Sequence, residues 1–444
     1  MTSPLHPTVL EVQRQPRLSP PAILDAQWLR QAALDAGVDD VGFLPLEDPS
    51  LDGERAEILS HFPFAQSLVS LVGRMNRENI RTPARSLANK EFHMAGDAIE
   101  HAVRLLVRRL EDMGIRAANA ANVGFPMEAD RWGSKMWVVS HKIVAVAAGL
   151  GKMGIHRNVI HPKFGNFILL GTLVLDRPVS AYSRPLDYNP CLECKLCVAA
   201  CPVGAIGTDG HFNFSACYTH NYREFMGGFG DWVNTVVESK NRRDYGQKVS
   251  PAETVSQWQS LSFGANYKAA YCLAVCPAGE DVIAPFLDDK KGFMDEVLRP
   301  LQAKLETIYV VPGSDAEEYV TRRFPHKKVK RVSNGLSSQP SVKAFLRGMP
   351  LAFQRGRSLG MDHVYHFTFT GSETAKATVI IRDRRISVQE GHQGQAGLAV
   401  TADSETWLKF LRKEANLFAA LLTRKVRLKG NPKLLLDFGK CFPS

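Results

Sequence analysis

The stretch CLECKLCVAACP, Cys191 to Pro202, places four cysteines at the spacing C-x2-C-x2-C-x3-C and follows the last with a proline. Seven of the eight cysteines in the 444-residue chain lie between Cys191 and Cys276, and only Cys441 lies outside. A secreted disulfide framework would not leave the rest of a long chain without cysteines. Structural zinc sites pair two short cysteine knuckles across a longer loop, which four thiols in one run do not provide.

This spacing resembles the bacterial ferredoxin run for [4Fe–4S] clusters, whose first three cysteines bind one cluster while the fourth binds the other. A two-cluster module then needs a second cysteine group, and the sequence supplies it in FSACYTH and YCLAVCPAG. We expect the following assignment: Cys191, Cys194, Cys197 and Cys276 bind the first cluster, and Cys201, Cys217 and Cys272 bind the second.

The second cluster is one cysteine short, because a regular motif would have a cysteine at the position of Ala269. Three interpretations stay open: this cluster is a three-iron form, it takes another ligand such as His220 or Cys441, or it is missing. Clusters of this kind transfer electrons and do not select substrates. Another part of the chain must therefore use the electrons, and an external donor such as a ferredoxin, a flavodoxin or a reductase must supply them.

The overall composition, with 45% hydrophobic and 23% charged residues, is ordinary for a soluble globular protein. The length suggests two or three domains. The sequence contains no run of about 18 uncharged apolar residues, so we expect no transmembrane segment. The first residues show neither a signal peptide nor a twin-arginine pair, so we expect the cytoplasm.

The net charge of +10 is unevenly distributed. Residues 1–330 contain 37 Lys and Arg against 37 Asp and Glu, whereas residues 331–444 contain 18 against 8. A basic run followed by a Ser/Asn/Gly/Pro-rich stretch in FPHKKVKRVSNGLSSQP indicates a linker, which we place at 301–339. The basic surplus is either a solvated surface, which we favour, or an attraction to an anionic membrane or an acidic partner.

Patterning predicts a mixed fold before the cysteines, of the α/β or α+β class. Apolar residues at three- and four-residue steps predict a helix over 96–113, ended by Gly114. Apolar runs predict strands at Ser67–Gly73 and Phe167–Leu175. Between them lies the glycine-rich stretch AAGLGKMGIHRNVIHPKFGNFILLG, which lacks the G-x-G-x-x-G dinucleotide fingerprint.

This stretch, the preceding AGVDDVGF and the following cysteine series occur in the order seen in cobalamin-dependent reductive dehalogenases and epoxyqueuosine reductases. The resemblance covers about residues 22–290, after an N-terminal extension at 1–21. It implies a nitroreductase-like corrinoid-binding core at 22–180 and a ferredoxin-type module at 181–300. It also implies bound cobalamin, held without its own base, near the following residues: Gly149, Gly151, Gly154, His156, His161 and Gly165.

One expected residue of these families is absent. Epoxyqueuosine reductases carry a catalytic aspartate about thirteen residues before the A-G-L-G segment, and this chain has Lys135 there. Asp130 or Glu128 would serve only after a local shift in register. Reductive dehalogenases instead use a tyrosine supported by basic residues, which Lys135 suits better, so Lys135 is our candidate catalytic residue. His141 and His156 are further candidates.

From Val364 onward, the alternation of Tyr365, Phe367 and Phe369 with polar residues predicts antiparallel strands with one buried face. A helix capped by Asp403 or Ser404 follows. The segment LFAALLTRKVRLKGNPKLLLDF resembles the sterol carrier protein-2 domain, over about 340–441, and we place this domain at 340–444. This resemblance implies a small α+β domain with an apolar or lipid ligand, or a pocket kept for packing or dimerisation.

Together these observations predict a cytoplasmic reductase with two iron–sulfur clusters, cobalamin and a hydrophobic organic substrate, resembling the dehalogenases. An alternative is a corrinoid-free electron-transfer protein with a lipid-binding domain. A tRNA epoxyqueuosine reductase is the third hypothesis. It ranks last because the reductase-like part has no net charge and the aspartate is replaced, so we expect no nucleic-acid partner.

Overall fold

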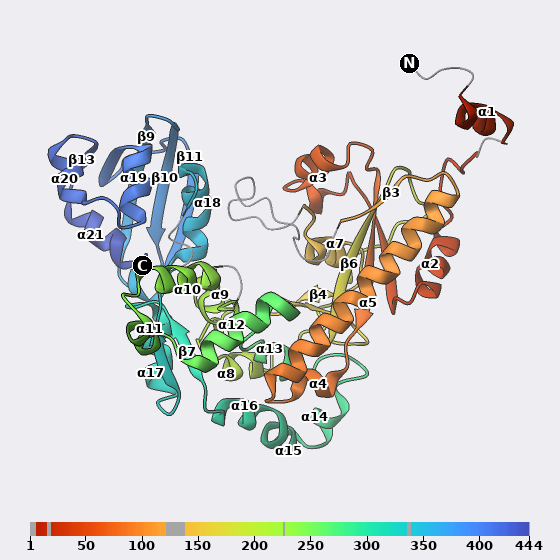
Figure 1. Ribbon diagram of the computed structural model, residues 1–444, viewed down its shortest axis with the longest axis horizontal. Helices are drawn as coiled ribbons and strands as arrows, with labels where there is room; N and C mark the ends of the chain where they lie inside the picture. Colours follow the sequence, from red (N-terminus) through yellow and green to blue (C-terminus); the bar gives the residue numbers. More distant parts are fainter. Residues whose placement is uncertain (1–5, 16–18, 121–137, 225–226, 335–338, 444) are drawn as a thin grey trace.

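The computed structural model describes residues 6–15, 19–120, 138–224, 227–334 and 339–443. Two sheets with their helices lie at opposite ends of the molecule, and the cysteine-containing segments lie between them (Figure 1). The predicted mixed α and β architecture is confirmed. Within the described ranges, no helix has the length and hydropathy needed to cross a bilayer.

The N-terminal sheet has four antiparallel strands in the order β1-β2-β6-β3. Their bounds are Asp40–Pro45 for β1, Ser67–Arg74 for β2, Ala117–Asn119 for β3 and Ile168–Leu175 for β6. The two predicted strands therefore correspond to β2 and β6, which pair with Val69 opposite Leu173. Both strands are almost continuously apolar because helices cover both faces of the sheet.

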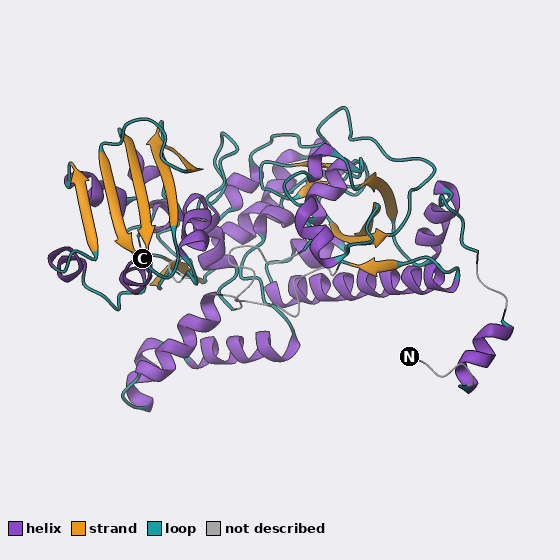
Figure 2. Cartoon of the chain, turned by 90° about the horizontal axis from the view of Figure 1, so that it is seen from above, coloured by secondary structure: helices purple, strands orange, loops and turns teal. Residues whose placement is uncertain are grey.

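Helix α5 (Arg85–Asp112) packs on one face of this sheet and α7 (His141–Ala147) on the other. α5 is longer than the predicted helix 96–113, since Ala88 and Phe92 continue its apolar stripe into the core of the cysteine module. The shorter elements nearby are α1 (Pro7–Arg14), α2 (Ala26–Asp35), η1 (Pro49–Leu51), α3 (Arg55–His61) and α4 (Arg77–Arg81). α1 lies apart from the rest of the chain (Figure 2).

Short helices joined by loops make up the cysteine module. Before the cysteines, β4 (Lys152–Met153) and β5 (Val159–Ile160) form a small hairpin. The helices are α8 (Leu196–Ala200), α9 (Phe214–Asn221), α10 (Gly227–Glu238), α11 (Arg242–Lys248), α12 (Pro251–Phe263), α13 (Tyr271–Ala274), α14 (Ala284–Asp288), α15 (Lys290–Phe293), the π-helical η2 (Met294–Leu298) and α16 (Arg299–Ala303).

The sequence suggested a linker at 301–339. The described part of this segment instead contains β7 (Thr307–Val310), α17 (Asp315–Arg323) and β8 (Lys328–Arg331), and the two strands pair in parallel. Lys327, in the basic run, is buried at 4% exposure and forms an ion pair with Glu306, with its Nζ 2.6 Å from Oε1. The composition therefore suggested a domain boundary at a place where the chain instead forms a packed βαβ unit.

The C-terminal sheet has the strand order β11-β10-β9-β12-β13. Its strands are β9 (Asp362–Thr370), β10 (Ala375–Arg382), β11 (Arg385–Glu390), β12 (Leu398–Asp403) and β13 (Val426–Gly430). Tyr365, Phe367 and Phe369 face the core, as their period of two predicts. The expectation of an entirely antiparallel sheet is wrong, because β12 pairs with β9 in parallel.

Helices complete this C-terminal unit. They are α18 (Val342–Ala352), η3 (Gly356–Ser358), α19 (Ser404–Leu411), α20 (Leu417–Leu422) and α21 (Lys433–Lys440). α19 begins as predicted, with Asp403 accepting a hydrogen bond from the Thr406 N–H at 2.9 Å. The helix ends at Leu411, before Lys413, which adopts a left-handed conformation with φ 63°. Asn416 then caps a new helix, α20.

Candidate functional site

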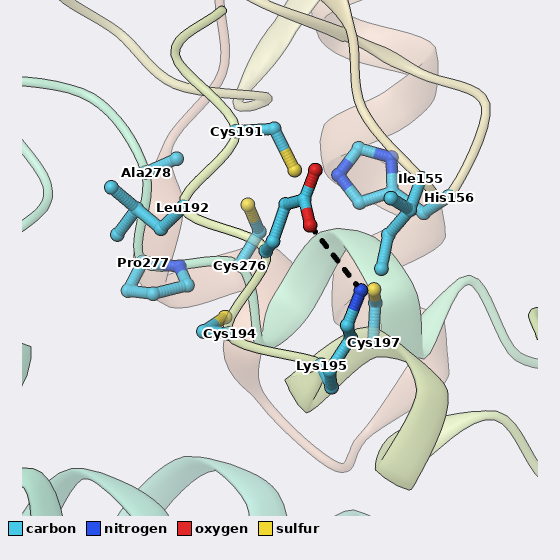
Figure 3. Close-up of a pocket in the computed structure, with 11 residues that line it drawn as sticks. Ile155, His156, Cys191, Leu192, Cys194, Lys195, Cys197, Cys276, Pro277 and Ala278 are labelled. Atoms are coloured by element: carbon cyan, nitrogen blue, oxygen red, sulfur yellow. Dashed lines mark ion pairs between the residues drawn. The ribbon is translucent and has the colours of Figure 1, made fainter. Parts of the chain in front are cut away.

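Four of the predicted ligands share one pocket. Cys191, Cys194, Cys197 and Cys276 line it, together with His156 and the other residues shown in Figure 3. Cys197 lies in the first turn of α8, and Cys276 follows α13, so segments about 80 residues apart in sequence meet here. The four sulfur atoms border a common space in Figure 3. This is the donor set that a four-iron cluster requires.

The loop before α8 explains how neighbouring thiols reach one space. Glu193 and Lys195, on either side of Cys194, both adopt left-handed conformations with φ of 48° and 63°. Non-glycine residues rarely adopt these angles, and such strain concentrates at sites where the surrounding structure requires it. The loop therefore wraps tightly around the pocket instead of continuing α8 backward.

The remaining three cysteines form a second group. The thiol of Cys217, in α9, interacts electrostatically with those of Cys201 and Cys272. The backbone N–H of Ala205 donates a hydrogen bond to Sγ of Cys201 at 3.2 Å. The hydroxyl of Tyr222 interacts with Cys217 and Cys272. The two groups are adjacent, since Cys197 of the first also interacts with Cys272 of the second.

Burial keeps these thiols protonated in the absence of a metal. It raises the pKa of Cys272 and Cys276 to about 12, and it also raises the pKa of Cys194, Cys197 and Cys201. A metal ligand must be a thiolate, so a cation has to supply the missing charge. Iron at these positions would do so, and the clustered thiols fit an iron–sulfur cluster better than an isolated structural role.

The structure places Cys441 away from this second group, whereas His220 lies on α9 with Cys217, and its buried Nε2 has no hydrogen-bond partner within the described residues. Cys441 is fully buried in the C-terminal core, where its Sγ lies 3.6 Å from Sδ of Met361. The Nδ1 of His220 accepts a hydrogen bond from the Tyr309 N–H at 3.3 Å, and the two rings stack. The position that a regular motif would give to a cysteine, Ala269, is buried in the module's core.

His220 gives a prediction for acid stability. Burial, with nearby Lys268 and Lys327, lowers its pKa from 6.5 to about 3. The unfolded chain then binds a proton that the folded chain cannot, so stability is full above pH 6.5 and is lost as the pH falls toward 3. We expect unfolding at pH 5 to cost about 2 kcal/mol less than at pH 7 from this residue alone. Urea titrations of the wild type and His220→Gln should show this difference only in the wild type.

Buffers of equal ionic strength and equal iron content are needed for that comparison, because acid also attacks iron–sulfur clusters. His363→Gln, at a partly exposed position of β9, is a control that should follow the wild type. An equal loss of stability on acidification in His220→Gln and in the wild type would contradict the prediction.

The glycine-rich segment packs against the chain itself. A Cβ at Gly149, with φ 75°, would clash with the carbonyl oxygen of Arg184, and one at Gly165, with φ 64°, would clash with that of Ala278. A Cβ at Gly151 would lie 2.5 Å from the carbonyl oxygen of Ile160. These glycines are therefore explained by close backbone packing. The contact of Gly165 with Ala278 fastens this segment to the turn that follows Cys276.

His156 and His161 use both ring nitrogens in contacts with the protein. The Nδ1 of His156 accepts from the Asn158 N–H at 3.1 Å, and its Nε2 lies 3.2 Å from Nδ2 of Asn166. His161 has its Nε2 3.0 Å from Oδ2 of Asp40, while its Nδ1 accepts from the Lys163 N–H at 3.1 Å. Both imidazoles thus fix the glycine-rich segment.

The catalytic candidates lie on the segment before this one. Lys135, with Asp130 and Glu128, falls within 121–137, outside the described residues. His141 is described, and its Nδ1 lies 2.7 Å from Oγ1 of Thr172 in β6. The role proposed for Lys135 stays a prediction.

Lys142 is a residue that the sequence did not single out. Its Nζ donates to the carbonyl oxygen of Arg157 at 2.8 Å and to Oδ1 of Asn158 at 3.0 Å. Its charge interacts with the thiols of Cys217 and Cys272, and desolvation lowers its pKa. The side chain nevertheless keeps accessible surface, as do those two cysteines. Only the tertiary fold brings these three side chains near one another.

Removing the positive charge of Lys142 should make the second cluster harder to reduce. We expect Lys142→Met to lower the reduction potential of that cluster by tens of millivolts, because reduction adds negative charge beside the ammonium group. An EPR-monitored redox titration measures this shift. Lys376→Met, on an exposed position of β10, is the control and should leave both potentials unchanged.

Comparisons with known proteins show what the two parts of the chain are similar to. A curated epoxyqueuosine reductase from Leadbetterella byssophila is 26% identical over 242 residues, which cover 46% of this chain and 73% of that protein. Residues 354–443 match the SCP-2 sterol transfer family. The predicted oxidoreductase class and both parts of the predicted resemblance are confirmed at this level.

Two solved structures are also similar. An epoxyqueuosine reductase crystallised with an epoxyqueuosine-modified tRNA stem loop is 18% identical, covering 73% of this chain and 80% of that one, with a TM-score of 0.36. A catabolic reductive dehalogenase is 16% identical, covering 61% of this chain and 34% of that one, also with a TM-score of 0.36.

Proposed function

We propose that the chain is an iron–sulfur, cobalamin-dependent reductase of a hydrophobic organic substrate, acting on a carbon–halogen or other carbon–heteroatom bond. The observation that carries this proposal is the pair of adjacent cysteine groups, fastened through Ala278 and Gly165 to the glycine-rich segment. Electrons from an external donor would pass between the two groups, which are close enough for the charges of Cys197 and Cys272 to interact. Residues at 22–180 form the reductase core in this proposal, and 181–300 form the electron-transfer module.

Cobalamin, when bound, would supply a low-valent cobalt for the reduction. The chain's own residues position and shield the site: His156 and His161 hold the glycine-rich segment, and Lys142 places a positive charge beside Cys217 and Cys272. This positive charge stabilises negative charge that accumulates on reduction.

For the C-terminal domain we propose an apolar ligand with a hydrogen-bond acceptor. Trp407 is 2% exposed and packs against Phe345 and Phe367, with ring centroids 5.9 and 5.8 Å apart. Its Nε1 has no hydrogen-bond partner within the described part of the chain. A buried donor costs free energy unless an acceptor reaches it, and the carboxylate or hydroxyl of a fatty acid or sterol would supply one.

A second candidate function is epoxyqueuosine reduction, which the name of the curated relative favours. The substrate would then be tRNA, so the expectation of no nucleic-acid partner needs its own test. The even charge balance of residues 1–330 supplies little attraction for phosphates, whereas the C-terminal quarter carries the basic surplus.

Anaerobic purification after expression with added cobalamin, followed by iron, sulfide and cobalt analysis, tests the main proposal. About one cobalt per chain, with an EPR signal of cobalamin lacking its lower base, would support it. Loaded protein is then given a halogenated aromatic compound or an epoxyqueuosine-containing stem loop, with reductant. Iron without cobalt would leave the corrinoid-free electron carrier, and turnover of the stem loop alone would favour the tRNA enzyme.

A further inference from the structure

We propose that the second cysteine group binds its iron–sulfur cluster through three thiolates, and that the corner beside Ala269 has no protein thiolate. This inference rests on the cluster-binding part of the proposed function. It is independent of cobalamin and of the substrate.

The two cysteine segments contain the same local structure. Lys195, with φ 63° and ψ 11°, is the left-handed cap of α8, and Ala270, with φ 53° and ψ 27°, is the left-handed cap of α13. Cys197 and Cys272 each occupy the second position of their helix. Cys194 directly precedes the cap of α8, and Ala269 directly precedes the cap of α13, so Ala269 occupies the position equivalent to Cys194.

The match extends to the ends of both segments. Cys201 and Cys276 each follow four residues after the helical cysteine, and each precedes a proline. Non-glycine residues in the left-handed region are uncommon, so finding one at the same step of both segments is a specific similarity. The second turn therefore keeps the shape of a cluster-binding loop although one thiol is missing.

Ala269 is held firmly in this position. It is 6% exposed, and its N–H donates a hydrogen bond to Oδ1 of Asn221 at 2.9 Å. The N–H of Lys268 donates to the backbone oxygen of Asn221 at 3.1 Å. Asn221 ends α9, the helix that carries Cys217. The helix that supplies one thiol of the second group thus also fixes the place where another thiol is absent.

Neither of the other candidate ligands supplies a thiolate beside Ala269. Cys441 packs in the C-terminal core and His220 packs on Tyr309, as described above. The iron at the unsupported corner would consequently be labile. On mild oxidation by ferricyanide, one ferrous ion and one electron leave a four-iron cluster; ferricyanide accepts the electron, and a three-iron cluster remains on the three thiolates.

The test uses the full-length protein, reconstituted anaerobically with iron and sulfide and then oxidised stepwise with ferricyanide. We expect the wild type to give the EPR signal of an oxidised three-iron cluster, at about one spin per chain. Ala269→Cys should abolish this signal and raise the iron retained after oxidation by about one atom per chain. Ala274→Cys, which adds a buried thiol two positions beyond Cys272 on the same helix, should behave like the wild type.

The converse variant is Cys194→Ala, which gives the first cluster the composition inferred for the second. It should add a second three-iron signal. Three results would overturn the inference: four-iron clusters in the wild type that both survive oxidation, iron for one cluster only after reconstitution, or a three-iron signal unchanged in Ala269→Cys. Because none of these readouts involves cobalt or turnover, failure of the reductase proposal would leave the inference intact.

Discussion

Replacing Cys276 with alanine is expected to remove the first cluster and roughly halve the iron bound per chain. Cys276 lines the same pocket as Cys191, Cys194 and Cys197, although it comes from the distant second segment. Without it the three remaining thiols all come from the segment 191–197, so this cluster, unlike the one in Cys194→Ala, no longer joins the two segments and is expected to be lost. We also expect electron transfer from an external donor to fall to the background level, because the path through the adjacent groups is interrupted. Iron analysis and stopped-flow reduction measure the two effects.

The control for this experiment is Cys441→Ala. Cys441 is also a buried thiol, but it lies in the C-terminal core beside Met361. Its loss should leave the iron content at the wild-type value. Equal iron loss in both variants, or full iron retention in Cys276→Ala, would contradict the assignment of Cys276 to the first cluster.

The second large effect is on the stability of the C-terminal domain. Phe367 is fully buried and contacts Trp407 and Phe438, with ring centroids 5.8 and 5.4 Å apart. Phe367→Ala removes a large aromatic side chain from a packed core, which costs about 3–5 kcal/mol. We expect a lower melting temperature for this domain, measured by differential scanning calorimetry, while the visible absorbance of the clusters is unchanged.

Thr368→Ala is the matched control, since Thr368 is the next residue of β9 and faces the other side of the sheet. Its effect should stay within about 0.5 kcal/mol. A loss of cluster absorbance together with the C-terminal transition in Phe367→Ala would show instead that the two units unfold as one.

The sequence predicted features that depend on local pattern. The apolar runs gave β2 and β6 nearly at their observed bounds, and period two placed Phe367 on the buried face. The cysteine spacing selected the same four thiols that line one pocket. In each case a short-range rule, either side-chain alternation or ligand spacing, contains the information.

Features that depend on contacts between distant segments were missed. The segment 301–339 was expected to be a linker because its basic residues suggested exposure, yet Lys327 is buried against Glu306. The parallel pairing of β12 with β9 carries no signature in either strand. Lys142 meets Cys217 and Cys272 only through the tertiary fold. The sequence does not distinguish a glycine that makes room for a cofactor from a glycine that makes room for another backbone segment.

The distance along the chain between Cys197 and Cys276 has a consequence for the life of the protein in air. A cluster bound to both closes a loop of 79 residues, and a covalent link of that span stabilises a folded chain by about 4–5 kcal/mol through the entropy of the unfolded state. Oxygen that destroys the cluster would therefore remove a cross-link as well as a redox centre. Air exposure should turn this reductase into a substrate for proteases, so that inactivated chains are cleared while cluster-loaded chains persist.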